Sequence, residues 1–82
     1  MSEAVLVGDK VYVLDLKGRV CPYPQLATLR AIRALPPGST LEVITDNPPS
    51  CENVPAVARR EGKEVLGVFE VEPGVWKIVI RL

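Results

Sequence analysis

Apolar residues alternate with polar ones, or cluster, in several short segments that are typical of β-strands. These segments are rich in β-branched side chains and are separated by turn residues such as Pro73-Gly74. The alternation is cleanest at the end of the chain, where one face carries Trp76, Ile78, Ile80 and Leu82. The pattern predicts four strands, at residues 11–16, 40–45, 64–72 and 75–82.

Residues 22–35 repeat their apolar positions as a helix does. The solvent side carries Arg30 and Arg33, and Pro36-Pro37-Gly38 ends the segment. The expected apolar positions are Leu26, Leu29, Ile32 and Leu35, with Ala27, Ala31 and Ala34.

A second helix is expected from Ser50, a favourable N-cap residue, to Gly62, a favourable C-cap residue. Pro55 lies near its first turn, and its expected core positions are Val54, Val57 and Ala58.

The element order β-α-β-α-β-β predicts an α+β fold. Right-handed crossovers place both helices on one face of a four-stranded mixed sheet, which gives a two-layer sandwich. The run Ala4–Val7 can pair with Val11 around Gly8-Asp9, so we consider an extra N-terminal strand within an extension at residues 1–10. The 82 residues are expected to form a single domain, 1–82.

Charge and cysteine content argue against several classes of function. Ten basic residues balance ten acidic ones, which argues against direct nucleic-acid binding. Neither a membrane span nor a signal-peptide pattern is present, so we predict a cytoplasmic protein with reduced cysteines. With two cysteines and no histidine, the chain offers neither an ordinary zinc site nor a Cys–His dyad, and no cofactor is expected.

The two cysteines are expected at one edge of the molecule. Both helices of such a fold begin just beyond the same ends of the parallel strands, and Cys21 and Cys51 lie at these two helix starts. A helix N-terminus favours a thiolate through its free N–H groups and its dipole.

With Cys21 as N-cap, Pro22 fits the first helical position and Pro24 has no N–H. The N–H of Tyr23 is then the leading donor to the sulfur. In a competing register, Pro24 is the first helical residue and Cys21 lies on the preceding turn. The plain alternative is that Cys21 is a small buried hydrophobic residue.

The run from Leu14 to Pro24, with Leu14-Asp15-x-x-Gly18 followed by Cys21-Pro22-Tyr23-Pro24, resembles the signature of the TusA/SirA/YedF family of small sulfur-carrier proteins. The resemblance covers residues 13–81, and its further matches are Pro37-Gly38, Leu41, Val43, Asp46, Pro48 and Pro55. It implies a fold like the C-terminal domain of translation initiation factor three.

The resemblance also implies that Cys21 accepts sulfane sulfur as a persulfide. Its donor would be a cysteine desulfurase, a rhodanese or a similar protein. Its acceptor would be a downstream protein in a route such as tRNA thiolation, molybdenum-cofactor supply or sulfur oxidation. The candidate supporting residues are Arg19, Pro22, Tyr23, Pro24 and Asp46.

Two positions depart from the family pattern. Asn53 stands where relatives carry Asp before Ile-Pro, and Cys51 is not required. Cys51 is either a semi-buried helix-start residue without chemistry or a second thiol that attacks an oxidised Cys21. The alternatives to a carrier are therefore a redox or regulatory module using Cys21 and Cys51, an interaction module with an inert cysteine, and an RNA-binding domain.

The sheet face away from the helices is expected to carry Ile44, Val79, Leu66 and Val68 among charged residues. Exposed apolar patches often mark contact surfaces, so weak self-association or partner binding is expected there, with scattered surface apolar residues as the alternative.

Overall fold

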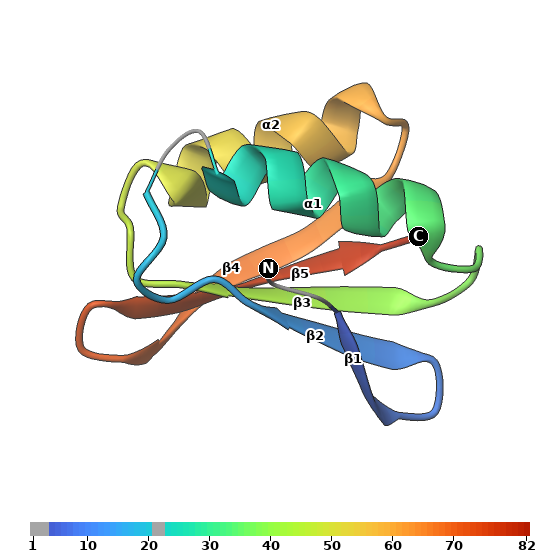
Figure 1. Cartoon of the computed structure of the whole chain (residues 1–82), viewed down its shortest axis with the longest axis horizontal. Coiled ribbons are helices and arrows are strands. Elements are labelled where there is room, and N and C mark those ends of the chain that lie inside the picture. Colours follow the sequence, from blue (N-terminus) through green and yellow to red (C-terminus); the bar gives the residue numbers. More distant parts are fainter. Residues whose placement is uncertain (1–3, 21–22) are drawn as a thin grey trace.

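The protein is seen here in a computed structural model, which describes residues 4–20 and 23–82. Within them, two helices lie on one side of a five-stranded mixed sheet (Figure 1). The elements are β1 (Val5–Gly8), β2 (Val11–Asp15), α1 (Tyr23–Ala34), β3 (Thr40–Thr45), α2 (Ser50–Arg60), β4 (Glu64–Glu72) and β5 (Val75–Arg81).

The strand order is β1-β2-β3-β5-β4. Only β2 and β3 are parallel, and the other neighbours pair antiparallel. The two-layer α+β prediction is confirmed, including the extra N-terminal strand. That strand forms a hairpin with β2, in which Val5 pairs with Val13 and Lys10 takes a positive φ of 60° at the turn.

The core lies between the sheet and the helices. From the sheet it takes residues that alternate along β2, β3 and β5, as a half-buried sheet requires. The buried apolar residues are Leu14, Leu16, Leu41, Val43, Ile78 and Ile80 from the strand side and Ala27, Ala31, Ile32, Val54, Val57 and Ala58 from the helices. This burial fixes the helix layer over the sheet and thereby sets where both helices begin.

The expected apolar face of α1 is wrong in part, because Leu26 is 52% exposed and Ala34 is also exposed. Each i+3 step in a helix rotates the side chain by about 60° away from the previous one. Four leucine and isoleucine positions spaced by three therefore spiral around the helix. The buried face is instead built on Pro24, Ala27, Thr28, Ala31 and Ile32.

The start of α2 also differs from the expectation, because Ser50 is the first helical residue and not the N-cap. The preceding residue, Pro49, already has helical angles (φ −58°, ψ −27°) and makes no side-chain cap. The N–H groups of Ser50, Cys51 and Glu52 donate to carbonyls three residues earlier, at 3.0, 3.0 and 3.2 Å. This 3₁₀-like turn satisfies donors that a side-chain cap would otherwise serve.

The C-terminus of α2 ends as predicted, at a glycine. Gly62 has a positive φ of 78°, and its N–H donates to the carbonyl of Arg59 at 3.0 Å. The N–H of Lys63 reaches the carbonyl of Ala58 at 2.9 Å. Together these two bonds form a Schellman motif, which favours glycine at its left-handed position.

A bulge in β4 changes the expected composition of the sheet face away from the helices. The register shifts between Val65 and Gly67, so Val68 pairs with Ile78 and Phe69 with Lys77. Directly paired residues of antiparallel strands share a face. Because Ile78 is buried under the helices, Val68 faces the helix side and its predicted position is wrong. Phe69 takes its place on the other face.

Candidate functional site

Both helices begin at the same end of the molecule, as Figure 1 shows. We call this end the helix-start edge: the loop of residues 16–20, the start of α1, the loop of residues 46–49 and the start of α2. Val20 and Tyr23, which flank Cys21 and Pro22, lie there, and so does Cys51. Cys21 and Pro22 themselves lie outside the described residues, so whether Cys21 is the N-cap of α1 stays a prediction.

The loop that leads to Cys21 is tied to the sheet by backbone bonds. The N–H of Leu16 donates to the carbonyl of Ile44 at 2.8 Å, which extends the parallel pairing of β2 and β3 past Asp15. The N–H of Arg19 donates to the carbonyl of Leu16 at 3.1 Å. Gly18, between them, has a positive φ of 83°, a conformation that glycine adopts without a steric penalty.

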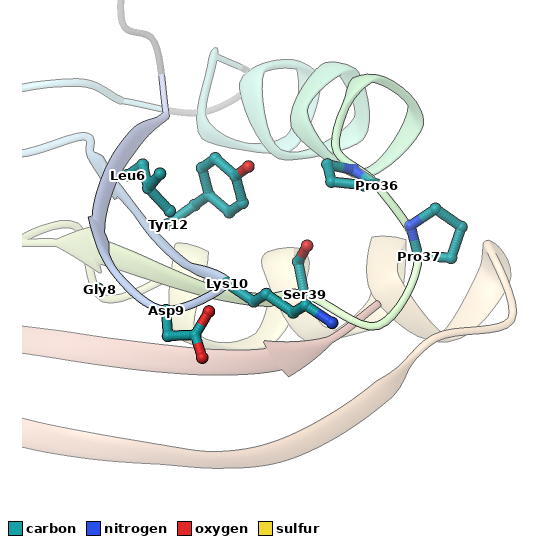
Figure 2. A pocket seen from close by; sticks show the side chains of 8 residues that line it. All are labelled: Leu6, Gly8, Asp9, Lys10, Tyr12, Pro36, Pro37 and Ser39. Carbon is teal, nitrogen blue, oxygen red and sulfur yellow. The ribbon is translucent and has the colours of Figure 1, made fainter.

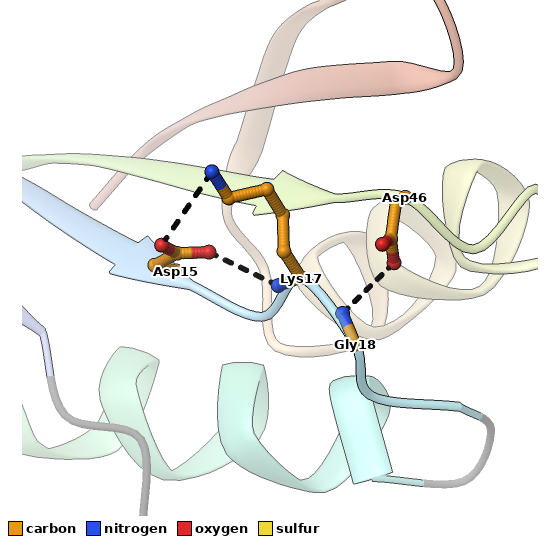
Figure 3. A network of polar contacts seen from close by, with 4 residues as sticks. All are labelled: Asp15, Lys17, Gly18 and Asp46. Atoms are coloured by element: carbon orange, nitrogen blue, oxygen red, sulfur yellow. Dashed lines mark hydrogen bonds and ion pairs between the residues drawn. The ribbon is translucent and has the colours of Figure 1, made fainter.

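Asp46 joins the two loops of the helix-start edge. Its Oδ1 accepts a hydrogen bond from the N–H of Gly18 at 3.0 Å (Figure 3). The chain that follows Asp46 is held in turn, because the Oγ1 of buried Thr45 accepts from the N–H of Asn47 at 3.1 Å. The sequence predicts Asp46 as a supporting residue but does not indicate Gly18 as its hydrogen-bond partner. The glycine that ends the motif Leu14-Asp15-x-x-Gly18 is the sequence feature that could have indicated this partner.

Asp15 and Lys17 form a smaller contact at the base of the same loop. The Oδ1 of Asp15 accepts from the Lys17 N–H at 3.0 Å, and its Oδ2 lies 4.0 Å from Lys17 Nζ (Figure 3). The side chains of Lys17 and Asp15 are 49% and 60% exposed, so the ion pair adds little stability. Its effect is local, since it fixes the exit of the chain from β2.

Tyr23 and Pro24 hold the start of α1. Pro24 is fully buried, and the half-buried ring of Tyr23 packs against the core. The guanidinium of Arg19 lies over that ring, 5.0 Å from its centroid, which is a cation–π distance. One cation is thereby placed beside the residues that flank Cys21.

The backbone of Tyr23 has a partner that the sequence did not suggest. Its N–H donates to the carbonyl of Val20 at 3.0 Å, so it does not act solely as a donor to sulfur. The bond joins the two residues that flank Cys21-Pro22. The geometry of the sulfur lies outside the described residues.

Cys51 is the second residue of α2 and is partly buried. Burial raises the pKa of its thiol, and the neighbouring Glu52 carboxylate raises it further. Its own N–H donates to the carbonyl of Pro48 at 3.0 Å. Burial and the Glu52 carboxylate both disfavour the thiolate, which is the nucleophilic form of a cysteine.

The described residues hold no group of three His, Cys, Asp or Glu side chains that could bind a metal ion. Neither of their helices has the length and apolar content of a membrane span. A pocket of about 400 Å³ lies at the other end of α1 (Figure 2). It is lined by Leu6, Gly8, Asp9, Lys10, Tyr12, Pro36, Pro37 and Ser39, and is thus separate from the helix-start edge.

The fold and this edge define a class: small α+β domains with a Cys-Pro-x-Pro segment where the first helix begins. Residues 12–82 match the family model described as sulfurtransferase TusA. The chain belongs to this family, the TusA/SirA/YedF sulfur carriers.

Individual relatives agree with the family match. A protein from Thermotoga maritima, provisionally named a sulfur carrier, is 45% identical over 69 residues, which cover 84% of this chain and 87% of the relative. YedF of Escherichia coli, with the same provisional name, is 44% identical over 64 residues, which cover 78% of this chain and 83% of the relative.

A solved structure shares the fold. The SirA-like protein from Desulfitobacterium hafniense superposes with a TM-score of 0.75 at 27% identity, covering 85% of this chain and 93% of that one.

Proposed function

We propose that Cys21 carries sulfane sulfur as a persulfide and relays it between proteins. The observation that supports this most is the family match, which spans the whole Cys21-Pro22-Tyr23-Pro24 segment. The helix-start edge is suited to the role. The segments that flank Cys21 are anchored by buried Pro24 on one side and by the Asp46–Gly18 bond on the other. The edge also carries the exposed cation of Arg19.

The transfer needs no oxidant or metal. The Cys21 thiolate attacks the terminal sulfur of a donor persulfide, and a new S–S bond forms as the donor's own S–S bond breaks. The bonding electron pair leaves on the donor thiolate. In the second step, an acceptor thiolate attacks the terminal sulfur held by Cys21, which returns Cys21 to a thiolate. The sulfur atom moves twice with no net change in oxidation state.

The donor in this proposal is a protein that forms a persulfide, of the cysteine desulfurase or rhodanese kind. The acceptor is a cysteine of a downstream protein, such as one that serves tRNA thiolation or the supply of a sulfur-containing cofactor. The relay would take place in the cytoplasm, where thiols stay reduced. Cys51, with its raised thiol pKa, takes no part in the relay.

Intact-protein mass spectrometry after incubation with a cysteine desulfurase and cysteine tests the proposal. The mass of one sulfur atom should be gained, and a thiol reductant should remove it. Cys21→Ser should gain none, whereas Cys51→Ser should load as the native chain does. Loading that persists in Cys21→Ser overturns the proposal. An internal disulfide in place of the added sulfur would instead indicate a thiol switch built on both cysteines.

A further inference from the structure

The sheet face away from the helices, which we call the open face, has a regular pattern of charge and apolar groups. Pairing across the strands places its residues in rows. One row consists of Val5, Val13, Glu42, Val79 and Gly67. The next row consists of Asp15, Ile44, Lys77 and Phe69.

Four residues on the two central strands form the middle of the open face. Glu42 is opposite Val79, and Ile44 is opposite Lys77. The charged residues therefore occupy one diagonal of this quartet and the apolar residues the other. All four are half-buried by their neighbours. Among the described residues, neither Glu42 nor Lys77 has an ion-pair partner.

We infer that the open face binds the open face of a second copy of this chain. A two-fold axis that runs along the Ile44–Val79 diagonal exchanges the other two corners. Each Glu42 then faces Lys77 of the other copy, while Ile44 and Val79 meet their own counterparts. One patch thus complements itself in both charge and polarity, as an isologous interface requires.

Apolar residues extend the quartet on both sides. Val5 and Val13 lie on the β1–β2 side, and Phe69 lies on the β4 side. The Phe69 ring lies over Gly67, since a Cβ added to Gly67 would be 2.5 Å from Phe69 Cζ. Phe69 is nevertheless 51% exposed and Val5 is 60% exposed, so contact with a second copy would cover apolar surface.

The size of the face indicates a reversible dimer. Strand spacing and residue rise give about 33 Å² of sheet plane for each residue on a face, and so about 400 Å² for about a dozen positions. Stable complexes bury about 800 Å² per partner. The dimer is therefore expected to assemble at high concentration and to separate on dilution.

Association through the open face leaves both helix layers pointing outward. Each copy keeps its helix-start edge accessible, because both helices begin on the side of the sheet away from the open face (Figure 1). The dimer would then present two independent edges to partners. The inference does not depend on sulfur transfer, and either one can fail without the other.

Sedimentation equilibrium over a concentration series, together with a charge exchange, tests the interface. The native chain should show a concentration-dependent dimer. Glu42→Lys and Lys77→Glu each place like charges opposite each other twice, so each should weaken association about tenfold or more. An equimolar mixture of the two variants restores both opposite-charge pairs and should associate about as tightly as the native chain. The double variant E42K/K77E should do the same.

Circular dichroism would show that each variant is folded, and desulfurase-dependent sulfur loading should stay unchanged in all of them. If one variant does not fold, Glu42→Gln and Lys77→Gln, which remove charge without reversing it, should each still weaken the dimer. A native chain that is monomeric at the highest concentration overturns the inference. So do single variants that dimerise like the native chain, or a mixture that associates no better than its components.

Discussion

The N–H of Gly18 donates to the carboxylate of Asp46 at 3.0 Å, across 28 residues of sequence. This bond connects the loop that precedes Cys21 to the end of β3, and Gly18 presents its N–H from a left-handed conformation with φ 83°. The two loops of the helix-start edge are therefore coupled. A change at Asp46 acts on the approach to Cys21 without touching the Cys-Pro-x-Pro segment itself.

Asp46→Ala should slow sulfur loading of Cys21 several-fold while leaving the chain folded. The loop loses its acceptor and becomes free to sample other positions. Because the bond is exposed, the free energy of unfolding should fall by only about 0.5 kcal/mol, the low end for a hydrogen bond. Asp46→Asn keeps an acceptor oxygen and should retain most of the loading rate. Time-resolved mass spectrometry and urea unfolding measure the two effects.

Asp9→Ala is the matched control, since it removes an exposed aspartate at the opposite end of the molecule. It should load at the native rate. The coupling of the two loops is refuted if Asp46→Ala loads as fast as Asp9→Ala.

Much of the fold could be predicted from the sequence, because the pattern of β-branched residues and turns is local. The bounds of β4 at Glu64 and Glu72 and the left-handed Gly62 are examples. The bulge at Leu66 could not be predicted, because an extra residue in β4 shows only in how β4 pairs with β5. The prediction that Ser50 is the N-cap is wrong for a related reason: backbone carbonyls, not its hydroxyl, accept from the first N–H groups of α2.

The same distinction between local and long-range features applies to the candidate site. The role of Cys21 stays a prediction from a local motif, whereas the Gly18–Asp46 bond, which the sequence did not indicate, joins positions far apart in the chain. The cation–π contact of Arg19 with Tyr23 likewise depends on how the loop folds back. Such contacts follow from tertiary structure, so sequence spacing alone could not indicate them.

The ion pair between Arg33 of α1 and Glu61, at the end of α2, should make stability depend on pH. Arg33 Nε donates to Glu61 Oε1 at 3.0 Å, and this hydrogen bond lowers the pKa of the Glu61 carboxyl. A lowered carboxyl pKa stabilises the fold above the unfolded-state pKa, and the stability is lost as the pH falls through the folded-state pKa. Arg33→Met should therefore lower the Tm slightly at pH 7 and leave it unchanged in acid.

Arg30→Met is the control for that measurement, since Arg30 is an exposed arginine on the same helix. It should leave the pH dependence of Tm as in the native chain. If Arg33→Met lowers Tm equally at neutral and acidic pH, the cause is lost packing and not the ion pair.

Gly62→Ala should destabilise the protein by about 1 kcal/mol, because an alanine at φ 78° is strained. The added Cβ would meet nothing within 4 Å, so the cost is conformational and not steric. Gly8→Ala is the matched control: Gly8 is outside the positive-φ region, and its added Cβ would lie 3.8 Å from Val11 Cβ, an ordinary contact. Equal stability losses in urea unfolding of the two variants would contradict the role of the Schellman glycine.

Cys51 should be a slow thiol at neutral pH, and Glu52 should account for part of that slowness. Burial is the larger cause of its raised pKa and Glu52 the smaller. In Cys21→Ser, Cys51 is the only remaining thiol of the chain. Its alkylation rate should therefore rise at a higher pH than that of free cysteine. Glu52→Gln should move the profile toward free cysteine without reaching it, because burial remains. Glu70→Gln, an exposed glutamate on β4, should not move it.

The same experiment bears on the choice between carrier and thiol switch. A thiol that is protonated at neutral pH attacks a persulfide poorly, since the thiolate is the nucleophile. With Cys21 restored and Cys51→Ser introduced, the remaining thiol should be alkylated faster at pH 7 than Cys51 is in Cys21→Ser. A Cys51 profile that matches free cysteine would contradict its raised pKa. The reverse order of alkylation rates would mean that Cys51 is the activated thiol. In that case the relay would have to be assigned to the second helix start.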